Sequence, residues 1–119
     1  MADKITKIDI VTRKSNFEEL KNALSEIGVM GMTVTQVLGC GTQKGDIQYN
    51  RGVPMELKLL PKFKVEIVVC EVPVDKVIAV AKKVLRTGEI GDGKILVYYV
   101  HDVIKIITGA TGKEALHNE

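Results

Sequence analysis

The order of strand-like and helix-like patterns constrains the fold of this chain more than any other feature of its sequence. Apolar and polar residues alternate over residues 4–11, as in a strand with one buried face. An amphipathic stripe at helical spacing follows and ends before Gly28, and residues 32–38 are again rich in Thr and Val. Ser15 and Glu18 have the spacing of a capping box, which predicts the start of the helix. The first half of the chain therefore has the pattern strand, helix, strand.

The second half of the chain repeats this pattern. Residues 63–70 alternate as the clearest strand in the sequence, and Pro73 is well placed in the first turn of a helix. An apolar stripe at helical spacing then runs to Gly88, and residues 95–100 form a fourth strand-like run. The residues from Ala110 onward are small and polar, and we expect them to fray.

A long polar and glycine-rich segment, residues 39–64, connects the two halves. Most connections in compact domains have about 4–6 residues, and much longer ones are usually functional or disordered. This segment carries lysine and arginine side chains together with many apolar ones, which a mere spacer would not need. We therefore expect a ligand- or partner-responsive loop on a rigid scaffold.

The full order of elements predicts an α+β fold, a ferredoxin-like βαββαβ sandwich with two helices on one face of a four-stranded antiparallel sheet. A chain of 119 residues is long enough for one core. We expect a single domain over residues 1–109 and a short flexible C-terminal tail over residues 110–119. Because residues 95–100 are apolar on both faces of their strand, we also expect the open face of the sheet to be buried in an oligomer.

Composition and charge disfavour several classes of function. The net charge is only +2, and the chain has two phenylalanines, three tyrosines and no tryptophan, which disfavours nucleic-acid binding. Nothing resembles a signal peptide or a membrane-spanning apolar run, so we expect a cytoplasmic protein without direct membrane insertion. The two cysteines are expected to be reduced thiols. With two histidines at no ligand-like spacing, they disfavour a zinc site.

Two clusters of glycine and lysine are candidate anion sites. Gly91, Asp92, Gly93 and Lys94 precede the fourth strand, where glycines let backbone N–H groups approach an anion and the lysine adds a charge suited to phosphate. A second cluster, residues 39–45, surrounds another lysine as the chain leaves the second strand. The alternatives are an ordinary turn for the first cluster and the start of a flexible loop for the second.

Two further lysines are candidate ligand contacts. The ammonium of Lys62 is placed to pair with a carboxylate ligand, and Lys105 to reach a phosphate, although exposed lysines are more often simply solvated. The sequence shows no catalytic triad, paired carboxylates or metal-ligand set. These residues favour binding over catalysis, and we do not expect an enzyme.

Two long motifs in this sequence resemble those of the PII nitrogen-regulatory signalling proteins. The first motif consists of residues 31–35, 39–45, 51–52 and 60–66, and the second of residues 87–95. Both match the family's signatures in order and spacing, and the likeness extends over about residues 4–109. In that family, three ferredoxin-like subunits pack their sheets together, so the resemblance implies a homotrimer whose interface covers the open sheet face.

The resemblance also implies a nucleotide, ATP or ADP, in each cleft between subunits. Within the second motif, Gly91, Asp92, Gly93 and Lys94 would then form a phosphate-binding loop. Val68 would lie near the base, and Lys105 would reach in from the neighbouring subunit. The nucleotide-binding residues implied in this way are Gly41, Thr42, Gln43, Val68, Gly91, Asp92, Gly93, Lys94 and Lys105.

A magnesium ion and a second small molecule follow from the same resemblance. Gln43 would help to hold Mg2+ on the ATP phosphates, and 2-oxoglutarate would chelate that ion. A carboxylate of 2-oxoglutarate would pair with Lys62. The residues implied for 2-oxoglutarate are Gln43, Lys44, Gly45 and Lys62.

The long connection corresponds to the family's T-loop, about residues 42–61, whose shape reports the ligand state to target proteins. The implied target is an ammonium transporter, glutamine synthetase or a nitrogen regulator. Tyr49, Arg51 and Met55 are the implied partner-binding residues, with Arg51 in the place of an arginine that some members insert into an ammonium channel.

Three residues depart from the family's usual pattern. Thr42 and Ile107 stand where many members have arginines near the nucleotide phosphates. Lys105 therefore lacks a second C-terminal cation beside it, and a lysine cannot make the bidentate contacts of an arginine. The alternative function is therefore a PII-like sensor of ADP, AMP or another small anion without a 2-oxoglutarate response. Met55 stands where bacterial members have a uridylylated tyrosine, so we expect no uridylylation at that position.

Overall fold

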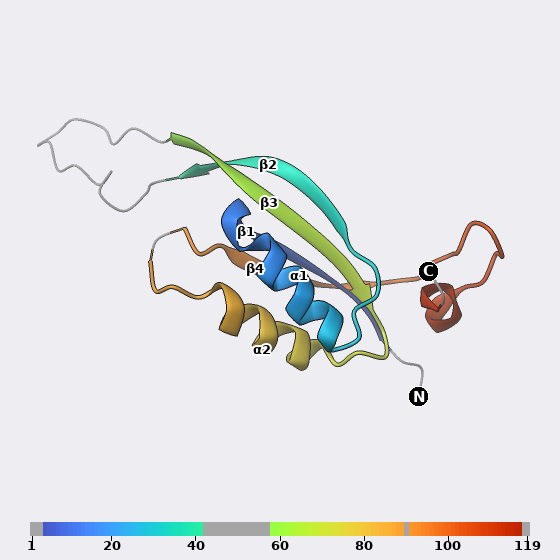
Figure 1. Cartoon of the computed structure of the whole chain (residues 1–119). Coiled ribbons are helices and arrows are strands. Elements are labelled where there is room, and N and C mark those ends of the chain that lie inside the picture. The colour runs from blue at the N-terminus through green and yellow to red at the C-terminus, as the bar shows by residue number, and fades with distance from the viewer. Residues whose placement is uncertain (1–3, 42–57, 90, 118–119) are drawn as a thin grey trace, which may run out of the picture.

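The computed structural model describes residues 4–41, 58–89 and 91–117, and its elements alternate as the sequence predicts. Six main elements form one sandwich, with α1 and α2 on the same face of the sheet (Figure 1). In chain order they are β1 (Ile5–Arg13), α1 (Phe17–Glu26), β2 (Thr33–Gly41), β3 (Lys58–Val69), α2 (Val74–Leu85) and β4 (Lys94–Val100).

The sheet is antiparallel throughout, with the strand order β2-β3-β1-β4. The two central strands are therefore β1 and β3, and the last strand of the chain pairs with the first. Two strand–helix–strand halves that interleave in this way form a ferredoxin-like sandwich, which confirms the predicted fold class.

The core lies between the helices and one face of the sheet. Strand residues at alternate positions face the helices, because successive side chains in a strand point to opposite faces. Leu20 and Leu24 of α1 and Val77 of α2 are fully buried against Ile8 and Ile67 of the central strands. Each such side chain contributes about 1.5–3 kcal/mol on burial. This packing fixes the strand ends from which the candidate site is built.

No helix of the described residues covers the other face of the sheet. Leu96 and Tyr98 of β4 are 42% exposed there. Asp9 of β1 lies on the same face, yet it is only 1% exposed. Its carboxylate accepts a 2.7 Å hydrogen bond from the Tyr98 hydroxyl, and Lys7 Nζ lies 3.4 Å away. An exposed apolar surface around a buried carboxylate is a suitable surface for a protein contact.

The predicted capping box at the first helix is wrong. Ser15 lies in a 3-10 turn over Lys14–Asn16, and the N-cap of α1 is Asn16 without a side-chain capping hydrogen bond. Phe17 at the start of the helix instead packs edge-on against Phe63 of β3, with 5.3 Å between ring centroids. The start of α1 is therefore fixed by packing rather than by a capping side chain.

The hairpin that leads into the long connection extends further than the sequence pattern indicates. Gly39–Gly41 pair with Lys58–Leu60, so residues 58–61, expected as loop, belong to β3. The pairing of β3 with β1 ends at Lys62, and Pro61 lies just outside it, on the side of the long connection. A proline can be accommodated there because the strand is paired on one side only. Residues 42–57 lie outside the described part of the chain.

The residues after Ala110 also differ from the expected fraying tail. A 3-10 turn forms over Gly112–Leu116, and Ala115 is only 1% exposed. His117 Nε2 and Lys113 Nζ lie 2.9 and 3.3 Å from Glu71 Oε1. Hydrogen bonds from His117 and Lys113 hold the pKa of Glu71 below its ordinary value. The buried Ala115 and the contacts of Lys113 and His117 with Glu71 keep the segment against the end of β3.

Candidate functional site

The connection from α2 to β4 contains a glycine loop, defined here as residues 87–89 and 91–93, which the side chain of Asp92 closes. The backbone N–H groups of Thr87 and Gly88 donate to Asp92 Oδ2 over 2.8 and 2.9 Å. The Thr87 hydroxyl donates to Asp92 Oδ1. These bonds from Thr87, together with those from Arg13 and Gly88, hold the pKa of Asp92 well below its ordinary value of 3.8. The Asp92 carboxylate therefore accepts hydrogen bonds from the loop itself.

The end of β1 fixes this loop in place. Arg13 Nη1 donates to Asp92 Oδ1 over 2.8 Å, and Thr12 Oγ1 donates to the Asp92 carbonyl over 3.1 Å. Gly93 has φ of +107°, and a Cβ at this position would lie 1.9 Å from the Val11 carbonyl oxygen. Glycine is required there because the loop backbone passes directly over the strand.

Lys62 connects β3 to the same loop. Its Nζ donates to the Gly91 carbonyl over 3.0 Å. Burial, followed by the nearby positive charge of Arg13, lowers the pKa of Lys62. Both effects disfavour the ammonium form, and an anion bound near Lys62 would act in the opposite direction by favouring that form. The structure therefore brings Lys62 and the predicted phosphate loop together.

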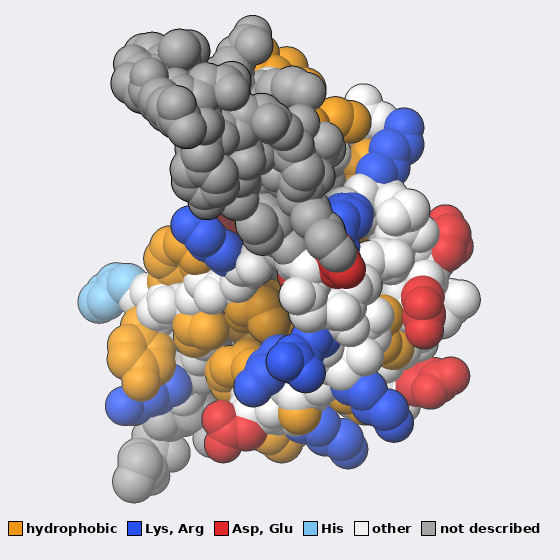
Figure 2. Space-filling model, turned by 90° about the vertical axis from the view of Figure 1, so that its left-hand side faces the viewer, with side chains coloured by type: hydrophobic (Ala, Val, Ile, Leu, Met, Phe, Trp, Pro, Cys, Tyr) orange, Lys and Arg blue, Asp and Glu red, His pale blue; other side chains and the backbone are white. Residues whose placement is uncertain are grey.

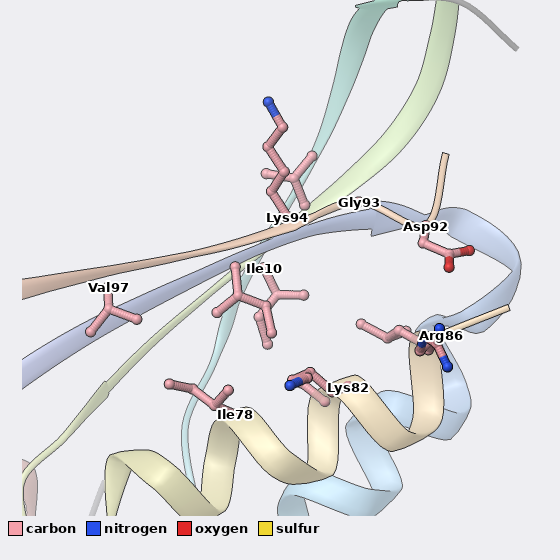
Figure 3. Close-up of a pocket in the computed structure, with 12 residues that line it drawn as sticks. Ile10, Ile78, Lys82, Arg86, Asp92, Gly93, Lys94 and Val97 are labelled. Atoms are coloured by element: carbon pink, nitrogen blue, oxygen red, sulfur yellow. The ribbon is translucent and has the colours of Figure 1, made fainter. Parts of the chain in front are cut away.

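A cavity of about 340 Å³ lies beneath the glycine loop, between α2 and the strands β1 and β4. Figure 3 shows Ile10 and Ile78 pointing toward this cavity, whereas Lys94 points away from α2. Figure 2 views the molecule from this end and shows Lys and Arg side chains around exposed apolar ones. With Lys94 and Lys62 close to the loop, this end of the molecule has the charge and the backbone geometry to hold an anion.

Val68 and Lys105 lie at the other end of the sheet. Val68 is paired with Lys7 and Lys94 with Val11, so these two pairs are about 13 Å apart along β1. A larger hollow of about 800 Å³ is lined by Val68 together with Gly31, Thr33 and His117. Lys105 Nζ donates to the His117 carbonyl over 2.7 Å, which places Lys105 at this end as well.

Of the predicted site residues around the long connection, the structure describes Gly41. It is the last residue of β2 and lies opposite Lys58. The remaining predicted residues of the long connection lie outside the described part of the chain: Thr42, Gln43, Lys44, Gly45, Tyr49, Arg51 and Met55.

Within the described ranges, no group of three or more His, Cys, Asp or Glu side chains is arranged to hold a metal ion. The same ranges contain no helix that is long and apolar enough to cross a membrane.

Thr12, Arg13 and Thr87 also belong to this site, although the sequence alone did not identify them. Arg13 and Asp92 are 79 positions apart in the sequence, and no local pattern connects them. A weak signal was present, since a polar Thr-Arg pair follows the alternating strand-like run. Only the pairing of β1 with β4 brings this pair beside the glycine loop.

Comparisons with known proteins agree with this arrangement. The model of the family "Nitrogen regulatory protein P-II" matches residues 5–110. A Nitrogen regulatory PII-like protein of Bacillus subtilis is 49% identical over 116 residues, covering 98% of this chain and all of the relative.

Two solved structures share the fold over nearly their whole length. A B. subtilis GlnK–ATP complex has a TM-score of 0.82 and 46% identity and covers 97% of this chain and 98% of its own. Arabidopsis thaliana PII bound to citrate has a TM-score of 0.75 and 37% identity, with 95% and 92% covered. The likeness includes the glycine loop and the strands that hold it, and the chain belongs to the nitrogen regulatory protein P-II family.

Proposed function

We propose that this signalling protein is a non-catalytic, cytoplasmic sensor that binds ATP or ADP and 2-oxoglutarate between the subunits of a homotrimer. It regulates targets of nitrogen metabolism or ammonium transport through its T-loop. The single observation that carries this proposal is the glycine loop, which strand β1 and Lys62 hold in one shape beside the ammonium of Lys94.

Nucleotide binding is supported by the chemistry of the loop. Gly91 and Gly93 both have positive φ, and the bulk of a side chain is absent where a phosphate would approach. The Asp92 carboxylate is already paired with Arg13 and does not oppose an anion as an unpaired charge would. The ATP bound in the related GlnK complex supports the same ligand class for this chain.

The separation of the two hollows supports a site between subunits. A nucleotide that contacts Lys94 with its phosphates and Val68 with its base would have to reach between opposite ends of one sheet. Two copies that pack their open sheet faces together can bring the glycine loop of one copy to the Val68 end of another. In that arrangement, Lys105 approaches the phosphates from the neighbouring subunit.

Lys62 supports the binding of a carboxylate such as that of 2-oxoglutarate. Its ammonium donates over 3.0 Å to the neutral Gly91 carbonyl, whereas a carboxylate would give a stronger, charge-assisted bond. The citrate bound to the related plant protein is a carboxylate ligand too. Gln43, Lys44 and Gly45 are proposed as the other contacts, with Gln43 also holding Mg2+ on the ATP phosphates.

Signalling requires that these ligands change the shape of residues 42–61. The hairpin of β2 and β3 enters this segment directly from the strand that carries Lys62. A ligand that binds one loop shape better than another shifts the population toward that shape, and a target then binds it. We assign the target contacts to Tyr49, Arg51 and Met55.

Calorimetric titration with 2-oxoglutarate, in the presence and absence of MgATP, tests the proposal. We expect 2-oxoglutarate to bind only when MgATP is present, and Lys62→Ala to abolish this binding while MgATP still binds. Lys83→Ala, an exposed lysine of α2, is the control and should behave like the wild type. Binding of 2-oxoglutarate without any nucleotide, or undiminished binding to Lys62→Ala, would contradict the assignment.

A second candidate function is a sensor of ADP, AMP or another small anion. It is favoured by Ile107, which is 85% exposed and supplies no cation at the end where Lys105 lies. The two missing contacts are those of the arginines that Thr42 and Ile107 replace. Each would have contributed about 1.5–3 kcal/mol to the free energy of nucleotide binding. Titrations with ATP, ADP and AMP distinguish the two functions, since a preference for ADP or AMP without any 2-oxoglutarate response supports the second.

A further inference from the structure

The last pair of residues between β1 and β3 consists of two cations. Arg13 lies directly opposite Lys62, and both side chains project from the same face of the sheet. Like charges directly opposite each other in a sheet are destabilising. The pair is tolerated because both side chains turn to the glycine loop, Arg13 to the Asp92 carboxylate and Lys62 to the Gly91 carbonyl.

The contacts of Arg13 show that it shapes the loop. One carboxylate, that of Asp92, links Arg13 to the backbone N–H groups of Thr87 and Gly88. A Cβ on Gly91 would lie 3.0 Å from Arg13 Nη2, so the guanidinium also packs against the loop backbone. Each of these contacts is made to a residue of the glycine loop, and Asp92 sits at their centre.

We propose that Arg13 and Asp92 are positioning residues for anion binding, which act together by holding the glycine loop in its binding shape. Neither contacts the bound phosphate. Asp92 thereby has a different role from the direct nucleotide contact that its place in the sequence motif implies. The inference rests on the proposed nucleotide-binding function for its affinity readout, and its structural readout needs no ligand.

Amide hydrogen exchange of the ligand-free protein tests the loop-holding role. We expect Arg13→Ala to speed the exchange of the Thr87 and Gly88 amides by about tenfold or more. Both amides donate to the Asp92 carboxylate, and this substitution removes the hydrogen bond from Arg13 that holds that carboxylate in place. Arg13→Lys should recover part of the protection because an ammonium can still donate to Oδ1. Unchanged exchange in Arg13→Ala, with the thermal midpoint also unchanged, would overturn the proposal whatever the protein binds.

Calorimetric titration with MgATP tests whether the two residues act as a unit. We expect Arg13→Ala and Asp92→Asn each to weaken MgATP binding by about 10- to 100-fold, and the double variant to be no more than about twofold weaker than Asp92→Asn alone. Lys83→Ala is the matched control that removes an exposed cation of α2 and should not change the affinity.

The outcomes separate this inference from the proposed function. If Arg13→Ala costs as much affinity in the Asp92→Asn background as in the wild type, Arg13 contacts the phosphate directly and the positioning role is wrong. If the wild type does not bind MgATP, the proposed nucleotide function fails. The hydrogen-exchange result then decides the loop-holding role alone.

Discussion

Gly93 is the residue at which the backbone of the candidate site has least freedom. Replacement by alanine places a Cβ within 1.9 Å of a backbone oxygen that cannot move without bending β1. We expect Gly93→Ala to lower the free energy of unfolding by at least about 2–3 kcal/mol, measured by urea denaturation at fixed protein concentration.

Gly88→Ala is the matched control for this substitution. Gly88 has φ of +84°, but nothing lies within 4 Å of a Cβ built there. Only the cost of a left-handed backbone remains, about 1–2 kcal/mol. If Gly93→Ala proved no more destabilising than Gly88→Ala, the close approach of the loop to Val11 would be wrong.

Asp92 makes the stability of the folded chain depend on pH. Hydrogen bonds from Thr87, Arg13 and Gly88 lower the pKa of Asp92 in the folded state. Its ionised form therefore stabilises the fold at pH values above 3.8, the ordinary pKa of this side chain. This contribution is lost as the pH falls toward the lowered pKa. We expect the wild type to melt at a higher temperature than Asp92→Asn at neutral pH, and the difference to shrink progressively below about pH 4. A difference that stayed constant over this range would contradict the pKa assignment.

At the scale of single elements, the start of α1 shows where a sequence motif misleads. Ser15 makes no capping hydrogen bond, so Ser15→Ala should change the free energy of unfolding by less than about 0.5 kcal/mol. A genuine cap would lose about 0.5–2 kcal/mol. Leu20→Ala, which truncates a fully buried side chain of the same helix, should lose about 2–5 kcal/mol in the same denaturation experiment.

The order and type of all six elements could be predicted from the sequence because each amphipathic pattern records which of its faces is buried. The ends of β2 and β3 could not, since residues 58–61 have no alternating pattern and are held by pairing with β2. The 3-10 turn after Ala110 was missed because it depends on ion pairs with Glu71, far away in the chain.

The candidate site was predictable only in part. Gly93 and Lys94 could be recognised from their local motif, and the structure places Lys62 beside them. The contribution of Arg13 could not be predicted, because it depends on the register between β1 and its two neighbouring strands.

At the scale of the whole molecule, the open sheet face is the surface that a homotrimer would bury. Leu96 lies on this face opposite Asp9, so a lysine at position 96 gains a carboxylate neighbour within the folded subunit. In an interface, the same lysine would place an ammonium group in the apolar surface where Leu96 packs in each copy, and removing that charge from water costs several kcal/mol. We therefore expect Leu96→Lys to fold but to dissociate into monomers, measured by light scattering during gel filtration.

Lys83→Glu is the control for this substitution, because it changes an exposed charge on the opposite, helical side of the molecule. It should leave the trimer intact. A wild-type protein that is monomeric at micromolar concentration, or a Leu96→Lys variant that remains trimeric, would show that this face is not the interface.

The phosphate site at the glycine loop is best tested by measuring MgATP binding to the wild type and to Lys94→Ala by calorimetry. We expect saturable binding to the wild type at a ratio close to one nucleotide for each chain. We also expect this binding to be lost in Lys94→Ala, with the thermal midpoint of the ligand-free protein unchanged. Equal affinity of the two proteins for MgATP would contradict the assignment of the glycine loop as the phosphate site.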